Sequence, residues 1–184
     1  MLIRLASKLQ KDSIVDGEGI RAVIWTQGCP HHCPSCHNPE TWDYNGGFSC
    51  DVEDLKKEIN SLDDEVGVTF SGGDPFEQAE ACCYLAKYIH SVNLNVWCYT
   101  GYTFEQLLKK GKEDSNVMNF LREIDILVDG PFVLKLKSYD IKFRGSKNQR
   151  LIKVKDSLET GKVVLYDLDK SKKDKKSKKQ EVYI

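Results

Sequence analysis

Three cysteines lie close together in the segment from Gln27 to Pro39, which is rich in proline and histidine. Cys29, Cys33 and Cys36 are separated by three residues and then by two. Thiolates at this spacing in a loop can converge on one metal centre. A closed structural zinc site takes four protein ligands, and a [4Fe-4S] cluster with a full protein shell takes four cysteines. Three cysteines therefore predict a metal centre with one open coordination position, which is a property of reactive sites.

The residues alone are also compatible with a second kind of metal site. His31, His32 or His37 would complete a Cys₃His zinc knuckle with the three cysteines, and the chain would then be a zinc-binding interaction module. By themselves, His31 and His32 are expected to be exposed loop residues rather than ligands.

Four further cysteines show no metal-ligand spacing. We expect them to be small buried or half-buried residues; they are Cys50, Cys82, Cys83 and Cys98.

Length and composition place the chain among ordinary globular proteins. Its 184 residues fit one domain, with 40% hydrophobic residues and a net charge of −1, which argues against nucleic-acid binding. No apolar segment predicts a signal peptide or a membrane span. An odd number of cysteines, seven, in a chain without an export signal argues against a disulfide framework. We therefore expect a cytoplasmic protein with metal or redox chemistry.

Segments typical of strands and of helices alternate along the chain. Strands are expected at residues 21–26, 66–70, 94–99, 124–128 and 162–166, and helices at residues 51–62, 77–91, 103–110 and 116–123. The first helix begins with a pattern like a capping box, with Asp51 as the capping residue and Asp54 three residues later, and repeats apolar residues at helical spacing. This alternation predicts an α/β fold with a mainly parallel sheet.

The clusters of unusual residues follow the expected strands. The cysteine loop follows the first strand, and the turns 71–75, 99–102 and 129–132 follow the next three. In parallel sheets, ligands bind beyond the carboxyl ends of the strands. We therefore expect all four loops to project from one face and to share one site.

Several segments together carry a family resemblance. They are Asp16-Gly17-Glu18-Gly19-Ile20-Arg21, the cysteine loop with His37-Asn38-Pro39-Glu40-Thr41-Trp42, Ser71-Gly72-Gly73-Asp74-Pro75, Tyr99-Thr100-Gly101-Tyr102-Thr103, Leu127-Val128-Asp129-Gly130-Pro131-Phe132 and Phe143-Arg144-Gly145-Ser146-Lys147-Asn148-Gln149-Arg150. The chain resembles the radical S-adenosylmethionine (SAM) superfamily and, within it, the activating proteins of the anaerobic ribonucleoside-triphosphate reductase. The resemblance covers roughly residues 1–166.

The resemblance implies a specific chemistry. In this family three cysteines, here Cys29, Cys33 and Cys36, hold a [4Fe-4S] cluster, and SAM chelates the fourth iron through its amino and carboxylate groups. An electron from the reduced cluster cleaves the sulfonium C–S bond and releases a 5′-deoxyadenosyl radical. That radical takes a hydrogen atom from one glycine of the large, glycyl-radical subunit of the reductase. An external one-electron donor, flavodoxin-like or similar, is implied as a second partner.

The resemblance also implies which residues contact SAM. Gly72, Gly73 and Asp74 match the element that positions its amino group, because two glycines allow close backbone approach and a carboxylate attracts an ammonium. The superfamily more often has Glu at the position of Asp74. The remaining expected contacts are Ser35, Cys36 and His37 beside the cluster, with Tyr99 and Thr100 at the adenosine.

The expected fold is a single-domain α/β protein, an incomplete parallel β/α barrel of the radical SAM type over residues 1–166. The chain is too short for a full eight-unit barrel, which needs about 250 residues. Residues 167–184 contain seven lysines and four acidic residues, and such a run is expected to be a disordered tail.

The sequence leaves open which glycyl radical enzyme the chain would activate. The chain would also fit an activase of another glycyl radical enzyme, such as pyruvate formate-lyase. The short chain, without an added ferredoxin-like set of cysteines, favours the small reductase activase.

Overall fold

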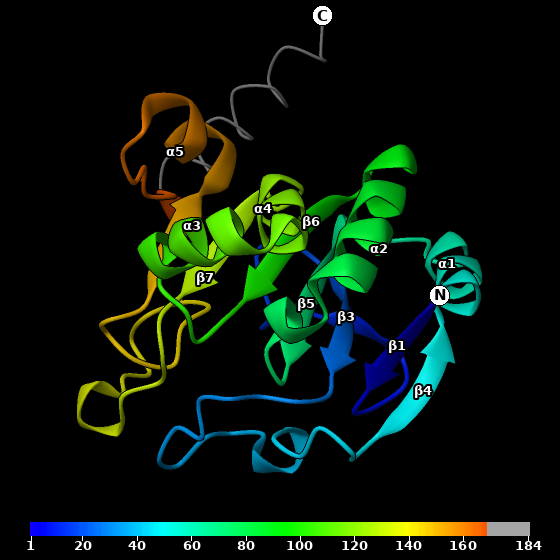
Figure 1. Cartoon of the computed structure of the whole chain (residues 1–184), viewed down its shortest axis with the longest axis horizontal. Helices are drawn as coiled ribbons and strands as arrows, with labels where there is room; N and C mark the ends of the chain where they lie inside the picture. The colour runs from blue at the N-terminus through cyan, green and yellow to red at the C-terminus, as the bar shows by residue number, and fades with distance from the viewer. Residues whose placement is uncertain (169–184) are drawn as a thin grey trace, which may run out of the picture.

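Eight strands form one mixed β-sheet in the computed structural model, which describes residues 1–168 (Figure 1). Apart from its first two residues, the lysine-rich tail expected at 167–184 lies outside the described residues. The strands are β1 (Leu2–Leu5), β2 (Gln10–Ser13), β3 (Arg21–Thr26), β4 (Phe48–Asp51), β5 (Gly67–Gly72), β6 (Asn95–Tyr99), β7 (Ile126–Asp129) and β8 (Arg150–Lys153).

The strand order is β4-β1-β3-β5-β6-β7-β8, and β2 pairs with β3 beside this path. The centre of the sheet is parallel, from β3 through β5 and β6 to β7. This part confirms the parallel sheet expected from the alternation of strands and helices. The strands β1, β2, β4 and β8 pair antiparallel to their neighbours, which the sequence did not predict. The fold is therefore a mixed α/β domain.

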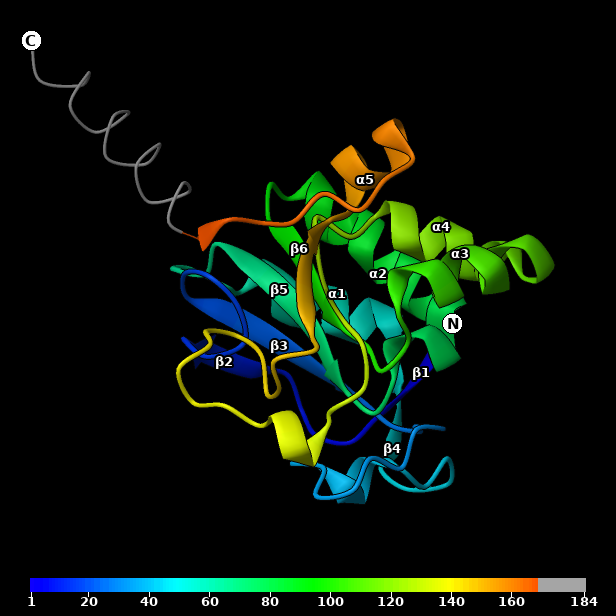
Figure 2. The same cartoon turned by 90° about the vertical axis from the view of Figure 1, so that its left-hand side faces the viewer.

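The five α-helices found in residues 1–168 pack on one another and on one face of the sheet (Figure 2). They are α1 (Val52–Asn60), α2 (Ala79–Ser91), α3 (Phe104–Glu113), α4 (Ser115–Arg122) and α5 (Val154–Thr160). The side chain of Asp51 accepts a hydrogen bond from the backbone N–H of Glu53, so the expected cap of the first helix is confirmed. Across residues 1–168, no helix combines the length and the apolar character that crossing a membrane requires.

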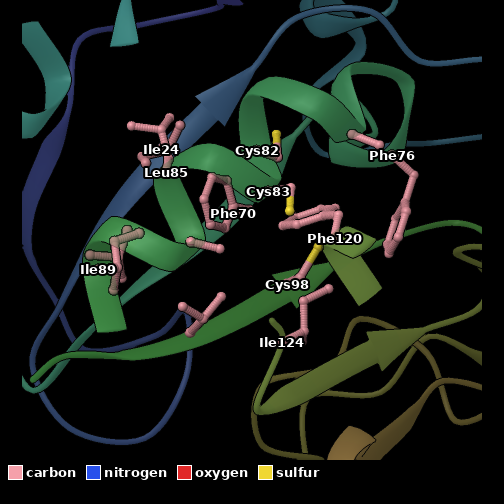
Figure 3. Close-up of a cluster of buried hydrophobic side chains, with 14 of the residues drawn as sticks. Ile24, Phe70, Phe76, Cys82, Cys83, Leu85, Ile89, Cys98, Phe120 and Ile124 are labelled. Atoms are coloured by element: carbon pink, nitrogen blue, oxygen red, sulfur yellow. The ribbon is translucent and has the colours of Figure 1, made fainter. Parts of the chain in front are cut away.

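The main core lies between the sheet and the helices. Phe120 of α4 is fully buried, and its ring centroid lies 5.3 Å from that of Phe70 on β5 and 4.9 Å from that of Phe76 (Figure 3). Figure 3 also shows three of the cysteines without metal spacing inside this cluster, where they are buried as expected: Cys82, Cys83 and Cys98. Cys50 is half-buried, and all seven cysteines are free thiols.

The sequence missed the last strand, β8 at Arg150–Lys153, and the expected strand at 162–166 is only an irregular segment paired with it. That segment makes one antiparallel bridge, between Leu165 and Ile152, and two backbone hydrogen bonds, from the N–H of Lys153 to Val164 (2.9 Å) and from the N–H of Tyr166 to Leu151 (2.8 Å). Gly161 ends α5 in the left-handed conformation, and the chain then runs back along β8. Tyr166 then packs against Trp97 on the face opposite the helices, with ring centroids 5.8 Å apart. Residues 162–166 therefore follow the edge of β8, with Val163 against the main core and Tyr166 against the cluster on the opposite face.

The aromatic contacts of Phe120 make it a sensitive test of the main core. Phe120→Ala is expected to lower the free energy of unfolding by about 3–5 kcal/mol, because it leaves a cavity between α4 and β5. Phe120→Leu, which keeps most of the volume, is the matched control and should cost about 1 kcal/mol. Urea denaturation followed by circular dichroism measures both. Equal stability of the two variants would contradict this packing.

Candidate functional site

A cavity of about 310 Å³ lies at the carboxyl ends of the parallel strands. Loops that follow β3, β5, β6 and β7 contribute to its wall, as the sequence predicted. Six of the expected site residues line it: Cys29, Cys33, Cys36, His37, Gly72 and Gly73. Tyr99 and Thr100, the expected border of the adenosine, line it as well. The four loops therefore share one site.

The cysteine loop folds back on itself through backbone hydrogen bonds. The N–H of Gly28 donates to the carbonyl of Thr41 over 2.8 Å, and the N–H of Cys29 donates to the carbonyl of Trp42 over 3.2 Å. The buried Gln27 side chain donates to two further carbonyls at the far end of the loop. These bonds hold a loop of little regular structure in a defined shape.

The three thiols of this loop differ in their surroundings. Cys29 is buried, and desolvation raises its pKa to about 11. Cys33 and Cys36 are half-buried, and burial also raises the pKa of Cys33. A metal binds the thiolate, so metal binding at Cys29 must displace a proton. Within residues 1–168, no three His, Cys, Asp or Glu side chains form a preformed site for a single metal ion, including the Cys₃His set of the zinc alternative.

The Gly72-Gly73 turn lies directly against the start of the cysteine loop. The N–H of Gly73 donates to the carbonyl of Thr26 over 2.7 Å, and the N–H of Asp74 donates to that of Gly28 over 2.8 Å. A Cβ atom on Gly73 would lie 2.3 Å from the Gly28 oxygen, and one on Gly72 would lie 2.5 Å from the Thr26 oxygen. Gly72 also has a φ of +99°, in the left-handed region. Both glycines are therefore required for the two backbones to meet.

Two expected contact residues do not line the cavity. Ser35 is an exposed residue at the tip of the loop, with a φ of +59°. Asp74 is fully buried behind the wall. Its carboxylate accepts hydrogen bonds from the Phe76 N–H (3.1 Å), the Thr100 hydroxyl (2.8 Å), the Gly101 N–H (3.0 Å) and Nε2 of His31 (2.7 Å).

His31 is not the exposed loop residue that the sequence suggested. It is half-buried and lines the cavity, and its ring packs edge-on against Tyr102 with centroids 4.5 Å apart. His32 is exposed as expected. His37 lies beside Phe132 from the loop after β7, with ring centroids 5.2 Å apart.

Two arginines that support the cavity wall, one of them buried, were not identified from the sequence. Arg21 is fully buried, and burial lowers its pKa to about 10. It donates to Thr69 and Asn95, and Thr69 in turn donates to the backbone of Asp16 at the cavity. The sequence signal that could have revealed this role is the position of Arg21, a charged residue at the start of an otherwise apolar strand.

A second arginine joins the last strand to the wall. Arg150 donates to Asp129, a buried carboxylate at the end of β7, and to Glu105 on α3. The hydrogen bonds with Arg150 lower the pKa of Glu105 to about 2. Gly145 and Gln149, just before Arg150, line the cavity. No spacing rule pairs Asp129 with a residue 21 positions away, so this bond was not predictable from the sequence.

Comparison with known proteins gives consistent matches. A family model described as a 4Fe-4S single cluster domain matches residues 15–152. The anaerobic ribonucleoside-triphosphate reductase-activating protein of Salmonella typhi is 36% identical over 146 residues, covering 74% of this chain and 90% of the relative. The proteins of that name from Escherichia coli K12 and phage T4 are 35% and 30% identical, each over 74% of this chain and over 90% and 86% of the relative.

One solved structure overlaps part of the fold. QueE from Escherichia coli has a TM-score of 0.43 and 17% sequence identity, and the match covers 55% of this chain and 53% of that one.

Two glycines in the left-handed conformation provide a matched test of the contact between the turn and the cysteine loop. Gly161 has a φ of +66° and free space around it, whereas Gly72 has no room for a Cβ atom. Gly161→Ala is expected to cost about 1 kcal/mol, from backbone strain alone. Gly72→Ala should cost at least about 2 kcal/mol more, because the backbones must separate. Thermal unfolding of both variants checks this, and equal losses would contradict the close approach.

The burial of Cys29 predicts an order of thiol reactivity in the metal-free protein. At pH 8 a thiol of pKa 11 is ionised in roughly one molecule in a thousand, so Cys29 should react with iodoacetamide at least about tenfold more slowly than Cys36. Pulse alkylation under anaerobic conditions, read by peptide mass spectrometry, measures both rates. In urea the difference should disappear. Equal rates in the folded protein would show that Cys29 is accessible.

Proposed function

The chain belongs to the family of anaerobic ribonucleoside-triphosphate reductase-activating proteins, and we propose that it is a radical SAM activase that generates a glycyl radical on such a reductase. The observation that carries this proposal is the meeting of three thiols and a Gly-Gly turn in one cavity. The relatives' names favour the reductase as partner over pyruvate formate-lyase.

We propose Cys29, Cys33 and Cys36 as the ligands of a [4Fe-4S] cluster. Soft thiolate donors suit iron in such clusters, and all three side chains line the cavity. Three ligands leave one iron for the amino and carboxylate groups of SAM. When bound, the reduced cluster supplies the electron that cleaves the sulfonium C–S bond of SAM to give methionine and a 5′-deoxyadenosyl radical.

The cavity wall supports binding of SAM beside the cluster. Gly72 and Gly73 offer a backbone surface without side chains, which allows a ligand to approach closely. Cys36 and His37 line the same cavity, and Tyr99 and Thr100 offer a border for the adenosine. Ser35 and Asp74 do not face this cavity, so the proposal gives them no direct contact.

The site reaches the protein surface, as a macromolecular substrate requires. Cys33 and Cys36 are half-buried, and His37 is exposed. A glycine-bearing segment of the reductase can approach from this side, and an external one-electron donor can reduce the cluster over a short distance. We propose the large glycyl-radical subunit as the protein substrate.

The proposal includes the incomplete β/α barrel and a cytoplasmic location. Four parallel strands whose carboxyl ends carry the site are compatible with such a barrel. Free thiols, seven in this chain, suit a reducing compartment. Residues 1–166 form the proposed activase domain.

Anaerobic reconstitution with iron and sulfide tests the proposed function. The wild-type protein should become brown and hold about four iron atoms per chain. After reduction, the electron paramagnetic resonance signal of the cluster should change when SAM is added. Addition of the reductase should then produce a glycine-centred radical and one methionine per radical formed.

The cysteine variants provide the matched controls for this experiment. Cys36→Ser should abolish the glycine-centred signal, because one ligand of the cluster is lost. Cys50→Ser, a half-buried cysteine outside the cavity, should keep the signal. A colourless zinc protein would exclude the proposal. SAM cleavage with a radical on pyruvate formate-lyase but not on the reductase would assign the alternative partner.

A further inference from the structure

We propose that Asp74 and His31 form a buried clasp that positions the cysteine loop, so that Asp74 acts as a positioning residue and not as a contact to SAM. Thr100 and Gly101 complete the clasp. This inference rests on the proposed function, because the loop that it positions is the proposed cluster-binding loop.

Asp74 is buried and its carboxylate is surrounded by donors of the chain. Its side chain has no exposed surface, and it does not line the cavity. Oδ2 accepts from His31, Thr100 and Gly101, at 2.7, 2.8 and 3.0 Å, while Oδ1 accepts from the Phe76 N–H at 3.1 Å. A buried carboxylate is stable only when donors surround it, and these four donors fulfil that requirement. Both oxygens of the carboxylate are thus engaged by donors of the chain itself, behind the wall of the cavity and not on its surface.

The four donors to Asp74 come from three different loops. Phe76 lies on the same turn as Asp74, after β5. Thr100 and Gly101 lie in the loop after β6, and His31 lies between Cys29 and Cys33 in the loop after β3. One carboxylate therefore joins the three loops that form most of the cavity wall.

The His31 ring fits closely between its neighbours. A Cβ atom on Gly101 would lie 2.3 Å from the His31 ring, and the ring also packs on Tyr102. Because a carboxylate only accepts, Nε2 carries the hydrogen of the 2.7 Å bond to Asp74. Packing and hydrogen bond together hold the ring in place, and with it the backbone of the cysteine loop. The adjacent His32 is exposed, and its ring lies beside that of Trp42, with centroids 4.8 Å apart.

The clasp and a direct SAM contact predict different results. If Asp74 positions the loop, losing His31 or Asp74 should loosen the three cysteines even when SAM is absent. If Asp74 binds SAM directly, His31 should be dispensable, and Asp74 variants should change only the affinity for SAM.

The metal-free protein gives the first readout. In His31→Ala, pulse alkylation of Cys29 should be about tenfold faster than in the wild type, because the loop opens more often when a hydrogen bond to a charged group is lost. His31→Gln keeps an amide N–H close to the position of Nε2, and its rate should lie within about threefold of the wild type. His32→Ala is the control and should match the wild type.

The reconstituted protein gives the second readout, in the absence of SAM. Iron release to a chelator should be about tenfold faster in His31→Ala than in the wild type, and Thr100→Val should release iron faster as well. The double variant His31→Ala/Asp74→Asn should release iron no faster than Asp74→Asn alone, because both changes break the same bond. Circular dichroism verifies that each variant is folded.

The outcomes separate the clasp from the proposed function. Wild-type rates of alkylation and of iron release in His31→Ala would overturn the clasp. An Asp74→Asn protein that changes only the SAM affinity would overturn it in favour of direct contact. A wild-type protein that binds no cluster would overturn the proposed function, while the alkylation rates of the metal-free variants would still decide the clasp.

Discussion

The contact between two stretches of backbone is the constraint on which the site depends. The Gly72-Gly73 turn lies against residues 26–28 with no space for a side chain, and the parallel register that pairs Thr26 with Gly72 brings them together. The cysteine loop begins at this contact, so its position is fixed by the sheet. If this contact were looser, the sheet would not fix the position of the loop that carries the three thiols.

Buried carboxylates occur at two strand ends and join loops in two different ways. Asp74 after β5 is surrounded by hydroxyl, amide and imidazole donors, whereas Asp129 at the end of β7 binds the guanidinium of Arg150. Each also accepts from a backbone N–H in the first turn of a helix: Asp74 from Phe76, in the short 3₁₀-helix that follows it, and Asp129 from Phe104, the first residue of α3. Two of the loops around the cavity are thus held at strand ends by an acidic side chain.

The sequence predicted the central elements well because their signals are local. The strand at 21–26 and the helix capped by Asp51 follow from apolar periodicity and capping chemistry. The antiparallel edges, and β8 in particular, depend on pairing between distant segments, which no local pattern reveals. The same limit applies to Asp74. Its motif places it at the site, but the direction of its carboxylate depends on His31 and Thr100, which come from two other loops.

The late position of β8 has a consequence for synthesis. Gly145 and Gln149 line the cavity and Arg150 anchors them, yet the cysteine loop leaves the ribosome more than a hundred residues earlier. At about 5–20 residues per second, the three thiols exist for on the order of ten seconds before their wall is complete. During translation they are therefore free thiols on an unfinished domain, and the site can form only after residue 150 has emerged.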